Sequence, residues 1–341
     1  MDYADYPPFV IKDIARVRRR INVSGLPQKI TDSNLLVATW NIRAFGSIYN
    51  SWGENSDSPK RNWHALACIA EIIKRMDVVA VQEVKSDTSG LRFMIDNFLG
   101  PHWRVILSDV TAGAGGNYER LAFLFDERRV RPSGLAGEVV LPQTQMGDPQ
   151  KQFDRTPYLV GFEAGGMHFS LLTAHIKYGS SPEEREPEIK ALAQFITNEI
   201  RARSNTPASE EKNLIVLGDF NFDKRGDNPL FQAFVSGGLM VPEQLLDIPT
   251  TYGSEAKYYD QIGWFMDENF ELSYMSRAGN VDFTGAIFKD ITLLQMSFRI
   301  SDHFPLWVEF STDNSAVRMA SALGVGEAQL ASPDPLSSIP D

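Results

Sequence analysis

Cysteine is almost missing from this sequence. Cys68 is the only one among 341 residues, so no disulfide bond can form within the chain. Long apolar runs are missing too, and the basic stretch ARVRRR near the N-terminus has no apolar segment after it. A chain of this kind suits a reducing compartment. We therefore expect a soluble, cytoplasmic protein without a secretory signal and without a membrane partner.

Zinc-type ligand patterns are equally scarce, because five histidines and one cysteine lie scattered along the chain. Positive charge is also in the minority: the net charge is -11 and the pI is near 5. This balance argues against indiscriminate electrostatic binding to a polyanion. It leaves open a locally basic groove, and carboxylates gathered around a divalent metal also make a chain acidic.

Hydrophobic residues make up 43% of the chain, enough for a large core. Short apolar or β-branched runs typical of strands begin at residues 35, 77, 103, 120, 158, 168, 213, 258 and 304. Helical patterns cover residues 62–76, 88–98 and 182–203. Many strands with few long helices predict an α/β fold, a four-layer α/β/β/α sandwich of two packed, mainly antiparallel sheets flanked by helices.

Both ends of the chain look peripheral to this fold. We expect residues 1–33 to form an irregular, charged N-terminal extension and residues 34–311 to form the catalytic domain. The small-residue- and Ser/Pro-rich segment 312–341 is expected to be a flexible tail, although its stretch 316–330 is also compatible with a short docking helix.

Several predicted strands end in polar side chains. For any one of them a turn or a cap is the simplest reading, because Asp and Asn are ordinary residues of strand-to-loop junctions. Glu and His are not turn formers, and six strands ending this way point to a shared site. The residues concerned are Asn41, Glu83, His175, Asp219 with Asn221, Asp260, and Asp302 with His303.

These residue types fit one chemistry. The oxygen ligands of Asn41, Glu83, Asp219 and Asp302 suit Mg²⁺ or Mn²⁺, which bind substrate phosphates through a few carboxylates. A carboxylate beside an imidazole supports general acid or base work, and the candidate pairs are Asp260 with His303 and Glu119 with His175. Two such pairs around a hard-metal site indicate an enzyme that hydrolyses phosphodiesters.

An ordered set of motifs carries a family resemblance over residues 35–311. The sequence resembles the endonuclease/exonuclease/phosphatase superfamily, and within it the deoxyribonuclease I-like nucleases. The motifs are TWNIRAFG (39–46), VQEVK (81–85), NYERLAFLF (117–125), DRTPYLVGF (154–162), LLTAHI (171–176), VLGDFNFD (216–223), YYDQIGWF (258–265) and ISDHFPLWVEF (300–310).

The resemblance implies a role for each site residue. It implies that His303, oriented by Asp260, activates water as the general base, and that His175, paired with Glu119, serves the leaving group. Asp219 and Asn221 would face the attacked phosphate. The further roles are a metal site at Asn41 and Glu83 with Asp302 nearby, and substrate contacts from Arg43, Arg155, Lys85 and Tyr118.

Some features depart from the family pattern. Lys85 stands where the family has an arginine that enters the DNA minor groove, so the charge is kept but the planar fork is lost. Tyr118 lies one residue closer to the glutamate than the family's groove-contacting tyrosine. The family's pancreatic-type members are secreted and disulfide-bonded, which this chain does not match.

The leading interpretation is a divalent-metal-dependent phosphodiesterase, a DNA endonuclease of low base specificity that needs no obligate protein partner. The alternative is a lipid or small-molecule phosphodiesterase or phosphatase on the same fold, of the sphingomyelinase or inositol phosphatase type, because a fold does not fix a substrate. A third reading, a binding module with a decayed site, is disfavoured because every catalytic position is filled.

Overall fold

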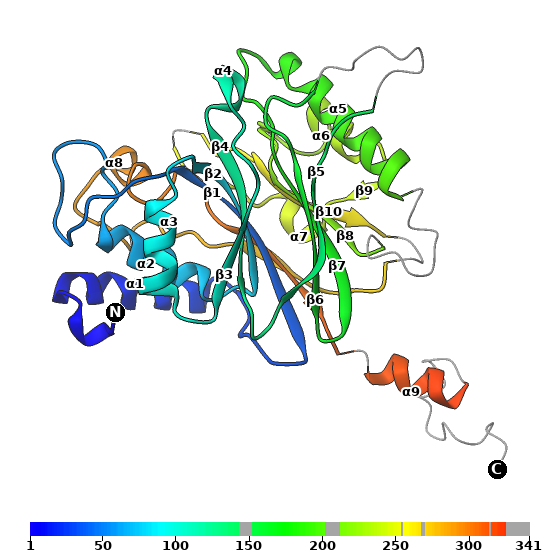
Figure 1. Cartoon of the computed structure of the whole chain (residues 1–341), viewed down its shortest axis with the longest axis horizontal. Coiled ribbons are helices and arrows are strands. Elements are labelled where there is room, and N and C mark those ends of the chain that lie inside the picture. Colours follow the sequence, from blue (N-terminus) through cyan, green and yellow to red (C-terminus); the bar gives the residue numbers. More distant parts are fainter. Residues whose placement is uncertain (143–151, 202–211, 254, 267–269, 314, 325–341) are drawn as a thin grey trace.

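Two six-stranded sheets form the centre of the protein. The computed structural model describes residues 1–142, 152–201, 212–253, 255–266, 270–313 and 315–324. The first sheet has the strand order β11-β12-β1-β2-β4-β3, and the second has the order β5-β6-β7-β8-β10-β9. Only β1–β2 and β7–β8 pair in parallel among these strands. The predicted sandwich of two mainly antiparallel sheets is therefore confirmed (Figure 1).

The strands of the first sheet are β1 (Asn34–Phe45), β2 (Val78–Lys85), β3 (Trp103–Leu107), β4 (Glu119–Asp126), β11 (Ser273–Asn280) and β12 (Leu306–Ser311). Those of the second are β5 (Arg131–Glu138), β6 (Tyr158–Ala164), β7 (Met167–His175), β8 (Leu214–Asp219), β9 (Leu239–Met240) and β10 (Asp260–Phe265). All nine predicted strands are present. The three that were not predicted, β5, β9 and β11, lie at sheet edges.

Helices cover the outer face of each sheet. The first is covered by α1 (Pro8–Val23), α2 (Trp63–Ile73) and α3 (Ser89–Met94), the second by α5 (Glu186–Phe195) and α6 (Pro229–Val235) (Figure 1). Helical turns Ile95–Leu99 and Ile196–Arg201 extend α3 and α5. The short helices are Tyr3–Asp5, α4 (Gly113–Gly116), Pro182–Glu184, α7 (Glu243–Leu246), α8 (Leu293–Ser297) and α9 (Ser315–Leu323).

Strand β1 is apolar on both faces because it lies between two cores. Leu35 and Val37 point into the core shared with the second sheet. Leu36 and Ala38 point into the core under the helices α1, α2 and α3. A strand buried on both sides has a continuous apolar run instead of an alternating one. This explains the sequence LLVATW, and it fixes the part of β1 that carries Asn41, four residues before the strand ends at Phe45.

The expectation of an irregular N-terminal extension is wrong for Pro8–Val23, which form α1. Val10, Ile14, Val17 and Ile21 recur at helical spacing and are buried against the core that also contains α2. Asp13 is buried with this stripe, and the other charged residues of the helix are exposed or partly exposed. The large number of charges made the apolar stripe hard to recognise in the sequence. The helical layer of the sandwich therefore includes residues that precede the predicted domain boundary.

At the other end, α9 forms the short helix that the sequence allowed, and the rest of the predicted flexible tail, residues 325–341, lies outside the described residues. Across the described residues, no helix is both long and apolar enough to cross a membrane.

The packing of α1 predicts a clear difference between two neighbouring apolar residues. Ile21 is fully buried, whereas Val23 is 73% exposed. We expect Ile21→Ala to lower the free energy of unfolding by about 2–5 kcal/mol, because it leaves a cavity in the core. Val23→Ala should change it by less than about 0.5 kcal/mol. Urea unfolding measures both, and equal effects would mean that α1 is not part of the folded core.

Candidate active site

Three adjacent strands of the second sheet, β7, β8 and β10, bring acidic and basic side chains together at one end of the strands. His175 of β7 pairs in register with Asp219 of β8, and Asp219 pairs in register with Asp260 of β10. Gly218 allows this close approach: a Cβ atom there would lie 2.1 Å from the carbonyl oxygen of Ala174. The sequence VLGDF therefore ends the buried strand with a carboxylate placed between two partners.

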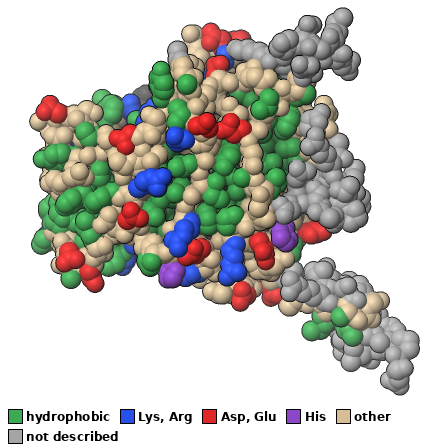
Figure 2. Space-filling view, viewed as in Figure 1, with side chains coloured by type: hydrophobic (Ala, Val, Ile, Leu, Met, Phe, Trp, Pro, Cys, Tyr) green, Lys and Arg blue, Asp and Glu red, His purple; other side chains and the backbone are tan. Residues whose placement is uncertain are grey.

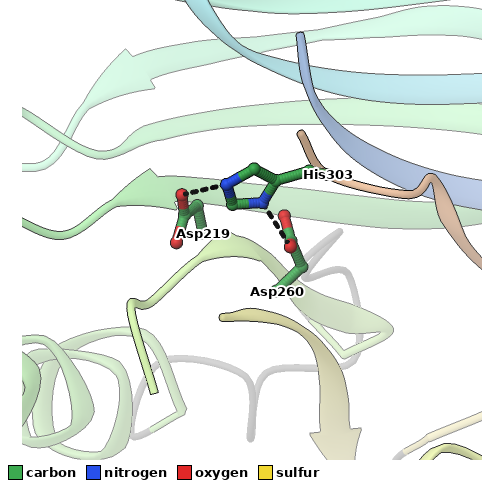
Figure 3. A group of neighbouring side chains, drawn as sticks. All are labelled: Asp219, Asp260 and His303. Atoms are coloured by element: carbon green, nitrogen blue, oxygen red, sulfur yellow. Dashed lines mark hydrogen bonds and ion pairs between the residues drawn. The ribbon is translucent and has the colours of Figure 1, made fainter. Parts of the chain in front are cut away.

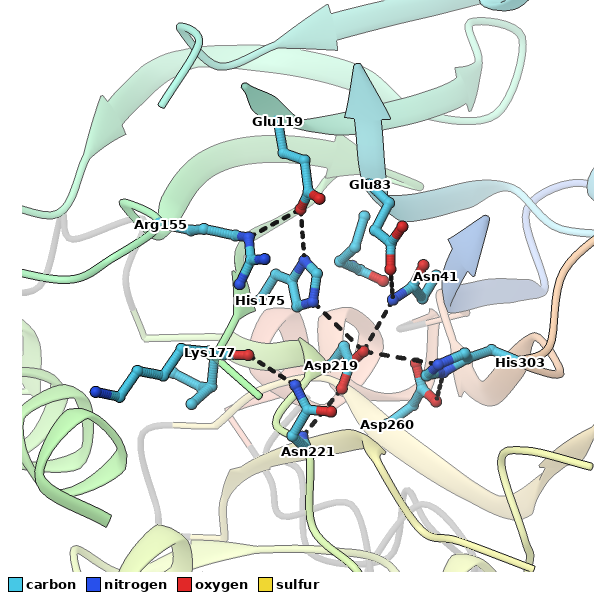
Figure 4. A network of polar contacts seen from close by, with 12 residues as sticks. Asn41, Glu83, Glu119, Arg155, His175, Lys177, Asp219, Asn221, Asp260 and His303 are labelled. Atoms are coloured by element: carbon cyan, nitrogen blue, oxygen red, sulfur yellow. Dashed lines mark hydrogen bonds and ion pairs between the residues drawn. The ribbon is translucent and has the colours of Figure 1, made fainter. Parts of the chain in front are cut away.

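Asp219 is the centre of the site (Figure 4). Its Oδ2 atom lies 3.7 Å from Nε2 of His175 and 3.9 Å from Nε2 of His303, which approach from two sides. The side chain is 1% exposed. The loop before β12 carries His303, and the peptide NH of His303 is fixed by the hydroxyl of Ser301 at 3.0 Å. Two imidazoles thus converge on one carboxylate.

His303 and Asp260 form the first imidazole–carboxylate pair, with Nδ1 and Oδ2 2.7 Å apart (Figure 3). Burial alone lowers the pKa of His303, but the carboxylates of Asp260 and Asp219 outweigh it and raise this pKa to about 10. Burial raises the pKa of Asp260. Both shifts favour a proton held between the two side chains. His303 is therefore protonated at neutral pH, and it can accept a proton from water only after it has lost the one on Nε2.

His175 and Glu119 form the second pair, with Nδ1 and Oε2 3.0 Å apart but without linear hydrogen-bond geometry. Glu119 also accepts hydrogen bonds from Lys85 (3.0 Å) and Asn117 (2.6 Å), and Nε of Arg155 lies 2.8 Å away. Burial raises the pKa of Glu119, but His175, Arg155 and Lys85 outweigh it and lower this pKa to about 2. Glu119 is therefore a buried anion with three basic neighbours.

The first sheet supplies the remaining oxygen ligands. The Nδ2 atom of Asn41 donates to Oδ2 of Asp219 (2.9 Å) and to Oε1 of Glu83 (3.1 Å). Glu83 has a positive φ of 60°, and the register of β2 shifts beside it, as at a β-bulge. This local irregularity turns the carboxylate toward Asn41, so the site spans both sheets.

Asn41 and Glu83 fit a hard divalent cation. The Oδ1 atom of Asn41 is buried and has no hydrogen-bond partner among the described residues, which leaves an oxygen available as a ligand. Asp219, Asp260 and His303 also lie within 4.8 Å of one another, but Asp260 and His303 already bond to each other. Asp302 precedes His303 at the border of this group: it pairs with Arg43 at 3.2 Å, and its side chain is 40% exposed.

The predicted substrate cations all have carboxylate partners. Arg43 pairs with Asp302 and also donates a hydrogen bond to the hydroxyl of Ser297 (2.7 Å). Lys85 and Arg155 both pair with Glu119. Tyr118 is 58% exposed beside this cluster. Contact of these groups with a phosphate stays a prediction, because the present pairs also satisfy the simpler role of balancing local charge.

Asn221 is placed by the turn that follows Asp219. Its backbone NH donates to Oδ1 of Asp219 (3.0 Å), and its Nδ2 atom donates to the carbonyl oxygen of Ile176 (2.7 Å). Its φ of 55° is in the left-handed region that Asn tolerates. The two-residue spacing of Asp219 and Asn221 therefore forms a turn and also places both side chains in the site. Of the two Nδ2 hydrogens of Asn221, one is bonded to Ile176 among the described residues, and the other can bind a ligand.

Sequence reasoning missed Arg61, which is 3% exposed. Its guanidinium donates to the carbonyl oxygens of Arg43 (2.7 Å) and Ala44 (3.2 Å) on one side, and of Arg299 (2.9 Å) and Ile300 (3.0 Å) on the other. Burial lowers the pKa of Arg61 to about 10. The residue joins the end of β1, just after Asn41, to the segment that carries His303. Its loop has no periodicity that signals this role.

Positive and negative side chains are mixed on the surface, so the described residues form no broad positive region on the face drawn in Figure 2. On the face shown in Figure 2, the described Lys and Arg side chains are interspersed with Asp and Glu. In a chain of net charge -11, recognition of a phosphate must therefore depend on a few placed cations.

The lowered pKa of Glu119 gives a pH-dependent prediction. Ionised Glu119 stabilises the fold above its unfolded pKa near 4.5, and this contribution is lost as the pH falls toward 2. The stability advantage of the wild type over Glu119→Gln should therefore be largest above about pH 5 and shrink below it. Denaturant unfolding of both proteins from pH 7 to pH 3 measures this. A constant difference would show that Glu119 is not a stabilised anion.

Comparisons with known proteins show what the whole chain is similar to. The model of the Endonuclease/Exonuclease/phosphatase family matches residues 38–263. A deoxyribonuclease of Thioalkalivibrio sp. (strain K90mix) is 28% identical over 287 residues, which are 82% of this chain and 71% of that protein. Deoxyribonuclease gamma of Mus musculus is 26% identical over 297 residues, 82% of this chain and 85% of that protein.

A solved structure shares the fold. The mannosyl-6-phosphatase of Bacteroides thetaiotaomicron VPI-5482 superposes with a TM-score of 0.53 at 18% identity, covering 81% of this chain and 99% of that one. The family match and the relatives named deoxyribonucleases show that this protein is a phosphodiester-hydrolysing enzyme. The chain belongs to the Endonuclease/Exonuclease/phosphatase family.

Proposed function

We propose that the protein is a divalent-metal-dependent DNA endonuclease that cuts the phosphodiester backbone with little base preference. One observation carries the proposal: two imidazoles, each backed by a carboxylate, approach Asp219 to 3.7 and 3.9 Å. Cleavage of a phosphodiester requires removal of a proton from water and delivery of a proton to the leaving oxygen. His175 and His303, which approach Asp219 from two sides, would supply these two proton transfers.

We assign the proton from water to His303, in the form that has lost its Nε2 proton and keeps the Nδ1 proton toward Asp260. We assign the leaving oxygen to His175, which Glu119 positions. Asp219 and Asn221 face the phosphate between them. Asn41 and Glu83 would hold Mg²⁺ or Mn²⁺, with Asp302 near the site, and a bound cation supplies charge stabilisation for the attacked phosphate.

The choice of DNA is supported by the relatives named deoxyribonucleases and by the cations around the site. Arg43, Lys85 and Arg155 would exchange part of their carboxylate pairing for backbone phosphates, with Tyr118 beside them. Contacts to phosphates carry no sequence information, so cleavage has little base preference. The second candidate, a lipid or small-molecule phosphodiesterase or phosphatase, draws support from the phosphatase that shares the fold.

Metal removal tests the proposed chemistry. We expect the protein to nick supercoiled plasmid with Mg²⁺ or Mn²⁺ and to lose this activity in EDTA, because the proposed ligands are hard oxygens. Single-stranded DNA, RNA, sphingomyelin and bis-p-nitrophenyl phosphate are assayed beside the plasmid. Full nicking after exhaustive chelation would remove the metal from the proposal. Hydrolysis of sphingomyelin without cleavage of any nucleic acid would favour the second candidate.

The two-histidine arrangement gives a sharper test. We expect His303→Ala and Asp219→Ala each to lower kcat by about 10²- to 10⁴-fold, as for a lost acid or base. His102→Ala is the matched control, because His102 is exposed and lies 4.0 Å from Glu127, outside the cluster. Near-wild-type turnover of a folded His303→Ala protein would refute the assignment.

A further inference from the structure

The exposed aromatic side chain of Tyr178 lies beside the site and takes no part in the proton transfers proposed above. Tyr178 follows His175 by three residues, and it is 56% exposed. A single exposed aromatic residue is ordinary on a protein surface. Tyr178 differs because buried side chains hold it in place next to the catalytic cluster.

Arg185 is the main support of Tyr178. It is 3% exposed, and the centre of its guanidinium lies 4.3 Å from the centre of the Tyr178 ring. Its Nε atom donates to the carbonyl oxygen of Tyr178 (2.5 Å), and its Nη1 atom donates to that of Asn221 (2.7 Å). One buried arginine thus fixes the backbone and one face of the Tyr178 ring, and ties both to the turn after Asp219.

Tyr259 connects this ring to the catalytic histidine. Its ring centre lies 6.1 Å from that of Tyr178, edge to face, and 5.8 Å from that of His303. Burial, and after it a hydrogen bond with the Tyr178 side chain, raises the pKa of Tyr259. The three rings form a continuous series that leads from His303 to the surface, and Tyr178 is its exposed end.

We propose that Tyr178 is a nucleobase-binding position: its exposed ring stacks on an unpaired base next to the phosphodiester that is cut. The inference rests on the proposed nuclease function and specifies the form of nucleic acid. Every base has a π face, so stacking holds a strand without selecting a sequence. Base pairs in a duplex already stack on their neighbours. The position therefore favours single-stranded or locally opened DNA over a closed duplex.

Two single strands of equal length and charge test this position. One is an oligothymidylate, and the other carries abasic tetrahydrofuran residues throughout. We expect the wild type to cleave the base-bearing strand with the higher kcat/KM. Tyr178→Ala should lower kcat/KM for that strand by roughly 5- to 100-fold, the range of a lost base–aromatic contact, and should lower it less for the abasic strand. Tyr178→Phe should keep the preference, and Tyr178→Leu should lose it.

The controls separate stacking from a structural role. Phe9→Ala removes another exposed ring, 49% exposed on α1, and should leave the preference between the strands unchanged. Thermal unfolding shows whether each variant folds. Equal losses on both strands with Tyr178→Ala, or no loss on either, would overturn the base-binding role while leaving the nuclease proposal intact. If the wild type cleaves neither strand and no plasmid, the proposed function fails, and the inference fails with it.

Discussion

The position of one buried carboxylate, that of Asp219, constrains the rest of the site. It lies at the end of β8, between β7 and β10, and a side chain from the other sheet, Asn41, donates to it at 2.9 Å. The site therefore exists only where the two sheets pack together. A buried carboxylate is costly unless its oxygens are paired, and Asp219 accepts hydrogen bonds from Asn41 and from the backbone NH of Asn221, with the imidazole of His303 at 3.9 Å.

Charge balance links the catalytic groups to the groups assigned to the substrate. Glu119 orients His175, yet it is also the partner of Lys85 and Arg155, at 3.0 and 2.8 Å. Under the proposed function, a phosphate entering here would compete with a carboxylate for the same cations. The cations are thereby held in place before a substrate arrives, and little side-chain entropy is lost on binding. This arrangement suits an acidic protein that must bind an anion at one point only.

Two kinds of strand were predicted from the sequence: strands that are buried on both faces, and strands that are followed by a reactive side chain. All nine expected strands formed, because short apolar or β-branched runs are buried most readily as strands of a sheet. The edge strands β5 and β11 were missed: β5 contains proline and glycine, and hardly any residue of either strand is fully buried. Helix α1 had a visible apolar stripe, Val10, Ile14, Val17 and Ile21, which its many charges obscured.

The supports of the site could not be predicted, because they join residues far apart in sequence through backbone carbonyls. Arg61 donates to carbonyl oxygens near residues 43 and 300, and Arg185 donates to those of Tyr178 and Asn221. A carbonyl is present at every position, so no residue type marks the partner. Each buried arginine has several donors in a fixed plane and can hold two chain segments at once. One fixes the segments that carry Asn41 and His303, and the other fixes those that follow His175 and Asp219. The sequence therefore names the candidate site residues, whereas the contacts of these two arginines, which join the segments that carry them, can be seen only in the structure.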